Sequence, residues 1–179
     1  PPELRRMVGA TVYTLDLPGH GRSPGSGCDT IECYADAVVA FVEESGIDEA
    51  TIVGHSMGGA IAQQLALEYV GWTSALGLIA TGARLRVASA ILDSIRDDFD
   101  HAVGLVTRYA WGPGASESLM ELGREALVDT GPDVLLGDFL ACDRFDAMDR
   151  LGEIEIPVLV ISGIADALTP VKYARFLAE

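Results

Sequence analysis

The stretch 50-ATIVGHSMGG-59 places Ser56 inside a Gly-x-Ser-x-Gly pattern. The apolar run Ala50 to Val53 before the serine predicts a buried strand. The run from Gly59 to Val70 after it is rich in Ala, Leu and Gln, which predicts a helix that stops at Gly71. A serine between a strand and a helix lies on a sharp turn that lifts its hydroxyl clear of a sheet. This context predicts an α/β fold with Ser56 as a candidate nucleophile.

The residues around Ser56 have expected roles in this turn. The predicted nucleophile turn comprises Gly54, His55, Ser56, Gly58 and Gly59. Gly54 and Gly58 are expected to leave room where a side chain would collide. The backbone N–H of Met57 begins the helix, where the positive end of the helix dipole would face a substrate oxyanion. His55 is expected to point away from Ser56 into the packing around the turn.

Further apolar runs extend the α/β pattern. Strands are predicted at Thr11 to Leu17, Ala75 to Ala80 and Pro157 to Ser162. Each run is nearly continuous in Val, Ile, Leu and Ala, which is typical of strands buried on both faces of a parallel sheet. Between the first two strands, apolar residues from Ile31 to Val42 recur at helical spacing, with a capping box from Asp29 to Glu32 and Gly46 just past the end. The sequence therefore predicts a mostly parallel sheet with flanking helices.

Residues 84–150 interrupt this alternation. Helical patterns there are punctuated by Gly-Pro-Gly at 112–114 and Gly-Pro at 131–132. An insertion after the third predicted strand would lie at the carboxyl end of the sheet, where open α/β folds bind ligands. We therefore expect an α/β core from 1–83 and 151–179 and a helical cap from 84–150.

The cap also contains side chains that suit an apolar acyl pocket. Trp111, Met120 and Phe139 are the candidates. The same residues at helical spacing equally suit a plain hydrophobic core, and the sequence leaves both interpretations open. The acyl group is not specified by these residues.

Composition limits the classes of partner. The chain of 179 residues has 12 basic and 27 acidic residues, for a net charge of −15. This charge argues against binding to nucleic-acid phosphates or to an anionic bilayer. No apolar run approaches the roughly 18 residues of a membrane-spanning helix. A small-molecule partner, with no nucleic acid and no membrane, is expected.

Cysteine usage predicts the compartment. The three cysteines, Cys28, Cys33 and Cys142, are too few and odd in number for a disulfide framework. We expect them to be reduced thiols in a cytoplasmic protein. The first residues show no apolar segment typical of a signal peptide.

Three blocks in the chain together resemble the α/β-hydrolase superfamily. They are 13-YTLDLPGHGRS-23, 54-GHSMGG-59 and 157-PVLVISGIADALTP-170, in the order found in that family. The resemblance is strongest to small esterase-like and C–C hydrolase enzymes with a helical cap. It implies Ser56 as nucleophile and Asp166 as the carboxylate that orients a catalytic histidine, without a metal or organic cofactor. A turn-forming Asp166 beside Pro170 is the alternative.

The catalytic histidine of the family follows the acid, at a distance of roughly 25 residues for a helix, a strand and two loops. In this chain only 13 of the 179 residues follow Asp166. His20 lies in a loop where the family's histidine is structural, and His55 adjoins the nucleophile. His101 lies in the acidic part of the cap, where a solvated role is favoured over one at the site.

The beginning of the chain is short by the same comparison. In the family, a strand before Thr11 lies between the strands that end here at Leu17 and Val53, and its loop supplies a second oxyanion donor. Without it, those two strands cannot pair in the family's way. We therefore expect the chain to be an internal part of a longer hydrolase.

The resulting functional prediction is a serine hydrolase acting on an ester or related carbonyl substrate through an acyl-enzyme. These residues alone are expected to show little or no turnover, because a serine hydroxyl needs a general base. One alternative is a lyase of the same fold that uses the serine for proton abstraction. The other is a non-catalytic binding module or truncated product.

Overall fold

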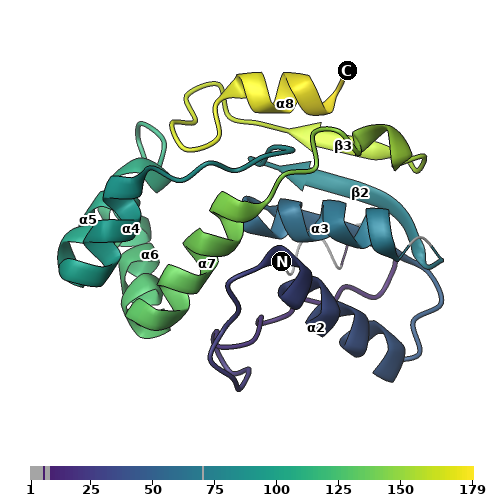
Figure 1. Ribbon diagram of the computed structural model, residues 1–179, viewed down its shortest axis with the longest axis horizontal. Helices are drawn as coiled ribbons and strands as arrows, with labels where there is room; N and C mark the ends of the chain where they lie inside the picture. Colours follow the sequence, from purple (N-terminus) through teal and green to yellow (C-terminus); the bar gives the residue numbers. More distant parts are fainter. Residues whose placement is uncertain (1–5, 7–8, 70) are drawn as a thin grey trace.

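The described part of the chain, residues 6, 9–69 and 71–179, folds around a parallel β-sheet in this computed structural model (Figure 1). The predicted α/β class with flanking helices is confirmed. In chain order the elements are α2 (Ile31–Glu44), β1 (Ala50–His55), α3 (Met57–Glu68), β2 (Thr73–Ile79), α4 (Ser89–Asp97), α5 (Phe99–Ala110), α6 (Glu117–Thr130), α7 (Pro132–Arg144), the 3-10 helix η1 (Leu151–Glu153), β3 (Val158–Ile161) and α8 (Val171–Leu177).

The strands lie in the order β1-β2-β3, and both pairings are parallel. Val53 pairs with Gly77, which pairs with Leu159, so these positions share one row of the sheet. Because all three strands run in the same direction, the residues that follow them meet at one edge. This edge brings the end of β1, with Ser56 after it, close to the loop after β3 that contains Asp166.

The strand predicted at Thr11 to Leu17 does not form. These residues have no regular structure, and Tyr13 is 54% exposed although its ring contacts the Phe41 ring at a centroid distance of 5.5 Å. A strand needs a neighbour for its N–H and C=O groups. Within the described residues, β1 pairs only with β2, and no strand lies between β1 and residues 11–17. The prediction was wrong because apolar content alone does not supply a hydrogen-bonding partner.

The N-cap of helix α2 lies one residue later than predicted. Thr30 is the N-cap, and its Oγ1 accepts a hydrogen bond from the Cys33 N–H at 3.2 Å. The predicted capping box at Asp29 is therefore wrong, and Asp29 pairs instead with Arg144. At the other end Gly46 has φ +62°, the left-handed conformation expected for the residue after a helix C-cap.

The sheet is covered on one face. Ala62 and Ala66 of α3 pack with Leu76 and Leu78 of β2 in a buried cluster, and α2 packs in turn on α3. On the opposite face Val53 is 60% and Leu159 62% exposed. The expectation that every strand is buried on both faces is therefore wrong for the described residues, whose helices cover the α3 side.

The helical insertion predicted between the third and fourth runs is present as α4 to α7. These helices gather on one side of the sheet, at the left of Figure 1. Ile95, Ala102 and Leu135 form their own buried cluster, with Phe139 packed against it. An isolated bridge between Arg84 and Asp146 joins the two ends of the insertion. Among the described helices, none combines the length and apolar character needed to cross a membrane.

The cysteines differ from the prediction. Cys28 and Cys33 form a disulfide, with Cα atoms 6.0 Å apart, because the turn into α2 brings the two residues together. Cys142 is a free, half-buried thiol. The expectation of reduced thiols is wrong for the pair, and the cytoplasmic location inferred from it loses that support.

Candidate active site

Ser56 occupies a strained turn between β1 and α3. Its backbone has φ 52° and ψ −119°, a combination that costs a residue with a side chain about 1–3 kcal/mol. The Ser56 N–H donates to the Ile79 carbonyl at 2.9 Å, and its carbonyl accepts from the Thr81 hydroxyl at 2.8 Å. The loop after β2 therefore holds the strained turn in place. Thr81 was missed from the sequence, although it follows the predicted strand directly.

The glycines of this turn are not equivalent. A Cβ on Gly54 would lie 2.0 Å from the Gly58 carbonyl oxygen, and one on Gly59 would lie 2.5 Å from Thr81 Cγ2. A Cβ on Gly58 would meet no atom within 4 Å. Gly54 and Gly59 are thus the positions where a side chain would collide, and the prediction for Gly58 is wrong. Gly58 instead contributes the backbone that approaches Gly54.

A cavity of about 640 Å³, here called the Ser56 cavity, opens over the ends of the strands. Ser56 and Asp166 both border it, from the residues after β1 and β3. The walls opposite them come from the start of α4, the end of α5 and the middle of α7, at Ile91, Trp111 and Phe139. Residues from α4 to α7 therefore border the same cavity as the two residues predicted to carry the chemistry.

Of the three candidates for an acyl pocket, Trp111 and Phe139 border the cavity and Met120 does not. Phe139 also packs against the Ile95 and Leu135 cluster, so the two interpretations of this residue both stay open. Arg86, which sequence reasoning did not select, also lines the cavity. Its guanidinium donates to the Asp143 carbonyl at 2.8 Å. Aromatic and aliphatic side chains dominate the walls.

The Asp166 carboxylate is half-buried and hydrogen-bonded within its own loop. Its Oδ1 accepts from the N–H groups of Leu168 at 2.9 Å and Thr169 at 2.7 Å, and its Oδ2 accepts from the Thr169 hydroxyl at 2.8 Å. A carboxylate has about four acceptor sites, so one remains. The loop fixes the orientation of the side chain and leaves it able to hold one more donor.

A second contorted residue lies beside Ser56. Ala80, directly after β2, has φ +46° and also borders the cavity. Its N–H donates to the Ile161 carbonyl at 2.8 Å, which ties it to the end of β3. Among the described residues with a side chain, Ser56 and Ala80 are those with positive φ, and both line the floor of the same cavity.

Met57 is the first residue of α3, directly after Ser56. The first N–H groups of a helix have no partner within it and carry the positive end of its dipole. The Met57 amide, as the first N–H of α3, therefore has no acceptor within the helix. In the described residues no group of three or more His, Cys, Asp or Glu side chains is arranged to hold a metal ion.

The histidines lie in different surroundings. Both ring nitrogens of His20 are engaged, by the Pro18 carbonyl at 3.1 Å and the Asp138 carboxylate at 2.9 Å. His101 is exposed and does not border the Ser56 cavity. His55 borders the cavity and is exposed, in line with the exposed row of β1, so the expectation that it packs around the turn is wrong.

Cys142 is a further nucleophilic side chain on the wall of the cavity. Burial is the main reason that the pKa of its thiol is raised from 9.0 to about 12, with smaller contributions from the charges of Asp138 and Asp143. At neutral pH the thiol is therefore protonated. The protonated thiol is a poor nucleophile.

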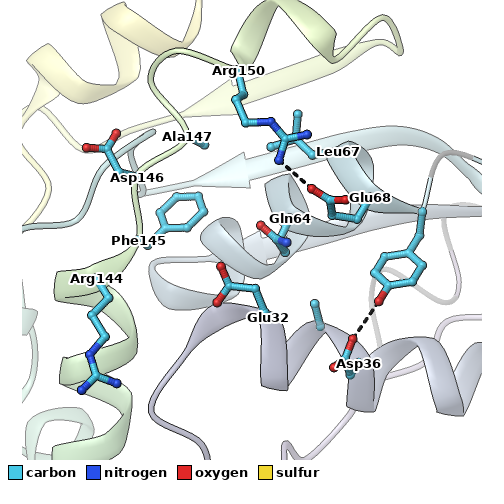
Figure 2. Close-up of a pocket in the computed structure, with 12 residues that line it drawn as sticks. Glu32, Asp36, Gln64, Leu67, Glu68, Arg144, Phe145, Asp146, Ala147 and Arg150 are labelled. Atoms are coloured by element: carbon cyan, nitrogen blue, oxygen red, sulfur yellow. Dashed lines mark hydrogen bonds and ion pairs between the residues drawn. The ribbon is translucent and has the colours of Figure 1, made fainter.

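A second hollow, here called the α2–α3 groove, has a volume of about 560 Å³ and is bordered by α2, α3 and residues 144–150 (Figure 2). It contains two pairs of hydrogen-bonded polar side chains. Arg150 donates to Glu68 at 2.6 Å, and the Tyr69 hydroxyl donates to Asp36 at 2.7 Å (Figure 2). Neither Ser56 nor Asp166 borders this groove.

Comparison with known proteins gives consistent matches. A sequence profile described as the alpha/beta hydrolase fold matches residues 1–115. The pimeloyl-[acyl-carrier protein] methyl ester esterase of Chromobacterium violaceum is 30% identical over 182 residues, which cover 94% of this chain and 70% of that protein. The solved structure of a thermophilic esterase is 35% identical with a TM-score of 0.84, covering 97% of this chain and 69% of that one.

A hydrolase from Oleispira antarctica is only 18% identical but superposes with a TM-score of 0.88, covering 99% of this chain and 71% of that one. At 18% identity, the match to the Oleispira antarctica hydrolase concerns the fold alone. A hydrolase from Pseudomonas aeruginosa superposes over 90% of this chain and 64% of that one. The chain thus spans about two thirds of the length of its relatives.

Proposed function

Because the chain belongs to the alpha/beta hydrolase fold family, we propose that it is a serine hydrolase acting on an ester or related carbonyl substrate. The observation that carries the proposal is the strained Ser56 turn on the floor of a cavity that Asp166 also borders. Strain of this kind persists only where the surrounding structure enforces it, and it concentrates at functional sites. The esterases among the relatives support the same reaction class.

In the proposed reaction the Ser56 Oγ attacks the carbonyl carbon while a histidine accepts the hydroxyl proton. The Met57 N–H donates to the oxyanion that forms. Collapse of the tetrahedral intermediate breaks the ester C–O bond, and the histidine returns the proton to the departing alcohol. Water then repeats these steps on the acyl-enzyme and releases the acid. Asp166 uses its remaining acceptor site to orient the histidine and to stabilise its charged form.

The general base is not assigned to any of the three histidines in the chain. The nitrogens of His20 are already bonded, and His101 lies off the cavity. His55 precedes Ser56, and consecutive side chains at the end of a strand leave on opposite sides. The 179 residues alone should therefore hydrolyse esters at little above the background rate.

The helices α4 to α7, within residues 84–150, are proposed to act as a cap over the site. Their apolar side chains at Ile91, Val106 and Phe139 form much of the wall facing Ser56. A small-molecule substrate with an apolar acyl group fits this lining. The chemistry needs no metal or organic cofactor.

A fluorophosphonate probe tests the proposal, because it forms a stable bond only with an activated serine. The protein is expressed both as these 179 residues and as the complete product of the parent reading frame, and the labelled peptide is identified by mass spectrometry. We expect labelling of Ser56 in the complete product and none in its Ser56→Ala variant. A folded complete product that remains unlabelled would refute the proposal.

The hydrogen bonds of Asp166 favour a second candidate, a binding module without catalysis. All three are donated by Leu168 and Thr169 of its own loop, which is also how an aspartate stabilises a turn. The variants Asp166→Asn and Ser56→Ala distinguish the candidates. In a hydrolase, Asp166→Asn lowers the rate of Ser56 labelling by orders of magnitude. In a binding module, the probe labels neither the unaltered protein nor the two variants at Ser56.

A further inference from the structure

Helix α7 lies unusually close to the loop of residues 18–29, here called the 18–29 loop. At Gly137 a Cβ would lie 2.5 Å from the Cys28 carbonyl oxygen. Cβ atoms on Gly19 and Gly27 would lie 3.1 and 3.0 Å from the methyl groups of Val134. Helix and loop therefore approach each other closely through glycines of both segments.

A polar network joins the same two segments. Asp138 of α7 accepts a hydrogen bond from the Tyr34 hydroxyl through Oδ1 and lies 2.9 Å from His20 Nε2 through Oδ2. Tyr34 is fully buried, and its oxygen accepts from the Cys28 N–H at 3.0 Å. The network thus connects α7, α2 and the 18–29 loop.

The protons of this network can be assigned from its partners. His20 Nδ1 faces the Pro18 carbonyl, so it carries a proton. One further proton lies between His20 Nε2 and Asp138 Oδ2, and the Tyr34 proton points at Asp138 Oδ1. Every hydrogen-bonding site on the His20 ring is then used. Burial raises the pKa of the Asp138 carboxyl, while its bonds to Tyr34 and His20 oppose the rise.

The other side of α7 forms part of the Ser56 cavity. Phe139 follows Asp138 directly and borders the cavity, as does Cys142 one turn later. Phe139 also packs against the cluster formed by Ile95 and Leu135. The position of α7 on the 18–29 loop therefore determines how far the Phe139 ring reaches toward the substrate.

We propose that Asp138, held by His20 and Tyr34, is a positioning residue that sets the place of Phe139 in the cavity and thereby the acyl chain length that the site accepts. The inference rests on the proposed function, since it concerns the selectivity of the same site. Asp138 does not border the cavity and acts only through α7. A wall fixed by a fully satisfied polar network has one position, and a wall released from it has several.

Two substitutions of Asp138 separate positioning from charge. In Asp138→Asn the amide oxygen accepts from Tyr34 and the amide nitrogen donates to neutral His20 Nε2, so both bonds are kept. In Asp138→Leu the branched shape is kept, with two larger methyl groups in place of the carboxylate oxygens, and both partners lose their bond. Asp133→Leu, at an exposed position in the first turn of α7, is the matched control for loss of an acidic side chain from this helix.

The experiment measures kcat/KM for p-nitrophenyl butyrate and p-nitrophenyl decanoate with the complete product of the parent reading frame. We expect the ratio of the two values to change at least fivefold in Asp138→Leu, and less than twofold in Asp138→Asn and Asp133→Leu. The rate of Ser56 labelling by a short-chain fluorophosphonate should change less than threefold in all of them.

Tyr34→Phe provides a second test if Asp138→Leu does not fold, as judged by circular dichroism. It removes one hydroxyl, keeps the ring volume, and should shift the selectivity ratio in the same direction by a smaller factor. An equal loss of kcat/KM for both esters, or an unchanged ratio in folded variants, would overturn the inference alone. Failure of the unaltered protein to hydrolyse either ester or to react with the probe would overturn the proposed function and this inference with it.

Discussion

The Ser56 cavity and the α2–α3 groove have similar volumes, about 640 and 560 Å³, but their polar groups are arranged differently. In the groove, Arg150 is paired with both Glu68 and Glu153, so its charge is already compensated. In the cavity, Ser56 is held in a strained turn, and Asp166 retains one acceptor site. Size alone would not distinguish the two hollows. What distinguishes them is a serine held at positive φ beside a carboxylate that its own loop holds in place.

The largest effect is expected from a methyl group added at the turn below the cavity. Gly54→Ala places a Cβ 2.0 Å from the Gly58 carbonyl oxygen. Neither β1 nor α3 can relieve this collision without moving. We expect a loss of about 3 kcal/mol or more in the free energy of unfolding, measured by urea denaturation.

Gly58→Ala is the matched control for this substitution. Its Cβ would meet nothing within 4 Å, and it replaces glycine by alanine near the start of α3. Stability should stay equal or rise by up to about 1 kcal/mol. Equal losses of stability from the two substitutions would show that Gly54 is not packed tightly against Gly58. The floor of the Ser56 cavity would then be less constrained than the comparison with the α2–α3 groove requires.

The next effect concerns the hydrogen bond that supports Ser56 from the loop after β2. Thr81→Val keeps the shape of the side chain but removes the 2.8 Å hydrogen bond to the Ser56 carbonyl. The Ser56 carbonyl keeps the Gly59 N–H as a donor at 2.8 Å, so the loss of one hydrogen bond should cost about 0.5–1.5 kcal/mol of stability. Fluorophosphonate labelling of Ser56 should slow in parallel. Thr81→Ser, which keeps the hydroxyl, should retain the labelling rate.

Cys142 gives a sharper test of which cavity group is reactive. With its pKa raised by burial from 9.0 to about 12, the thiol is protonated at pH 8 and should react with iodoacetamide far more slowly in the folded protein than in urea. A thiol whose pKa is raised by folding stabilises the folded state while both states are protonated. That contribution is complete below pH 9 and is lost as the pH rises toward 12. Rapid alkylation of the folded protein at pH 8, followed by mass spectrometry, would contradict this description.

The smallest effect is expected in the α2–α3 groove. Arg150→Ala removes the ion pairs with Glu68 and Glu153, whose side chains are about half exposed to water. Exposed ion pairs contribute little to folding because water and salt already screen them. The urea midpoint and the labelling of Ser56 should both stay within error of the unaltered protein. A clear loss of labelling would show that the groove takes part in the function of the cavity.

The parts of the fold that the sequence predicted are those in which local pattern and final environment agree. The run Ala50 to Val53 forms most of β1 because the next run, Ala75 to Ala80, supplies its partner in β2. Thr11 to Leu17 was also predicted as a strand, but no described strand lies beside it. A single run does not specify which strand it pairs with. The sequence pattern therefore predicted individual elements better than it predicted which strands pair.

The same distinction applies to the candidate site. Ser56 and Asp166 could be placed at one edge because parallel strands end together. Thr81 and Arg86 could not, because their roles depend on how a loop returns across the turn and on where α7 ends. The disulfide between Cys28 and Cys33 also escaped prediction, since counting cysteines ignores the turn that brings two of them together.

The two positive-φ residues after β1 and β2 affect the order in which the structure unfolds. The N–H groups of Ser56 and Ala80 donate hydrogen bonds to the Ile79 and Ile161 carbonyls of the neighbouring strands. Their unfavourable backbone angles therefore persist only while those strands remain paired. Fraying at the tip of β3 would release Ala80 first and loosen its neighbour next. Inactivation should therefore precede melting, with the floor of the pocket relaxing while the helices around it are still intact.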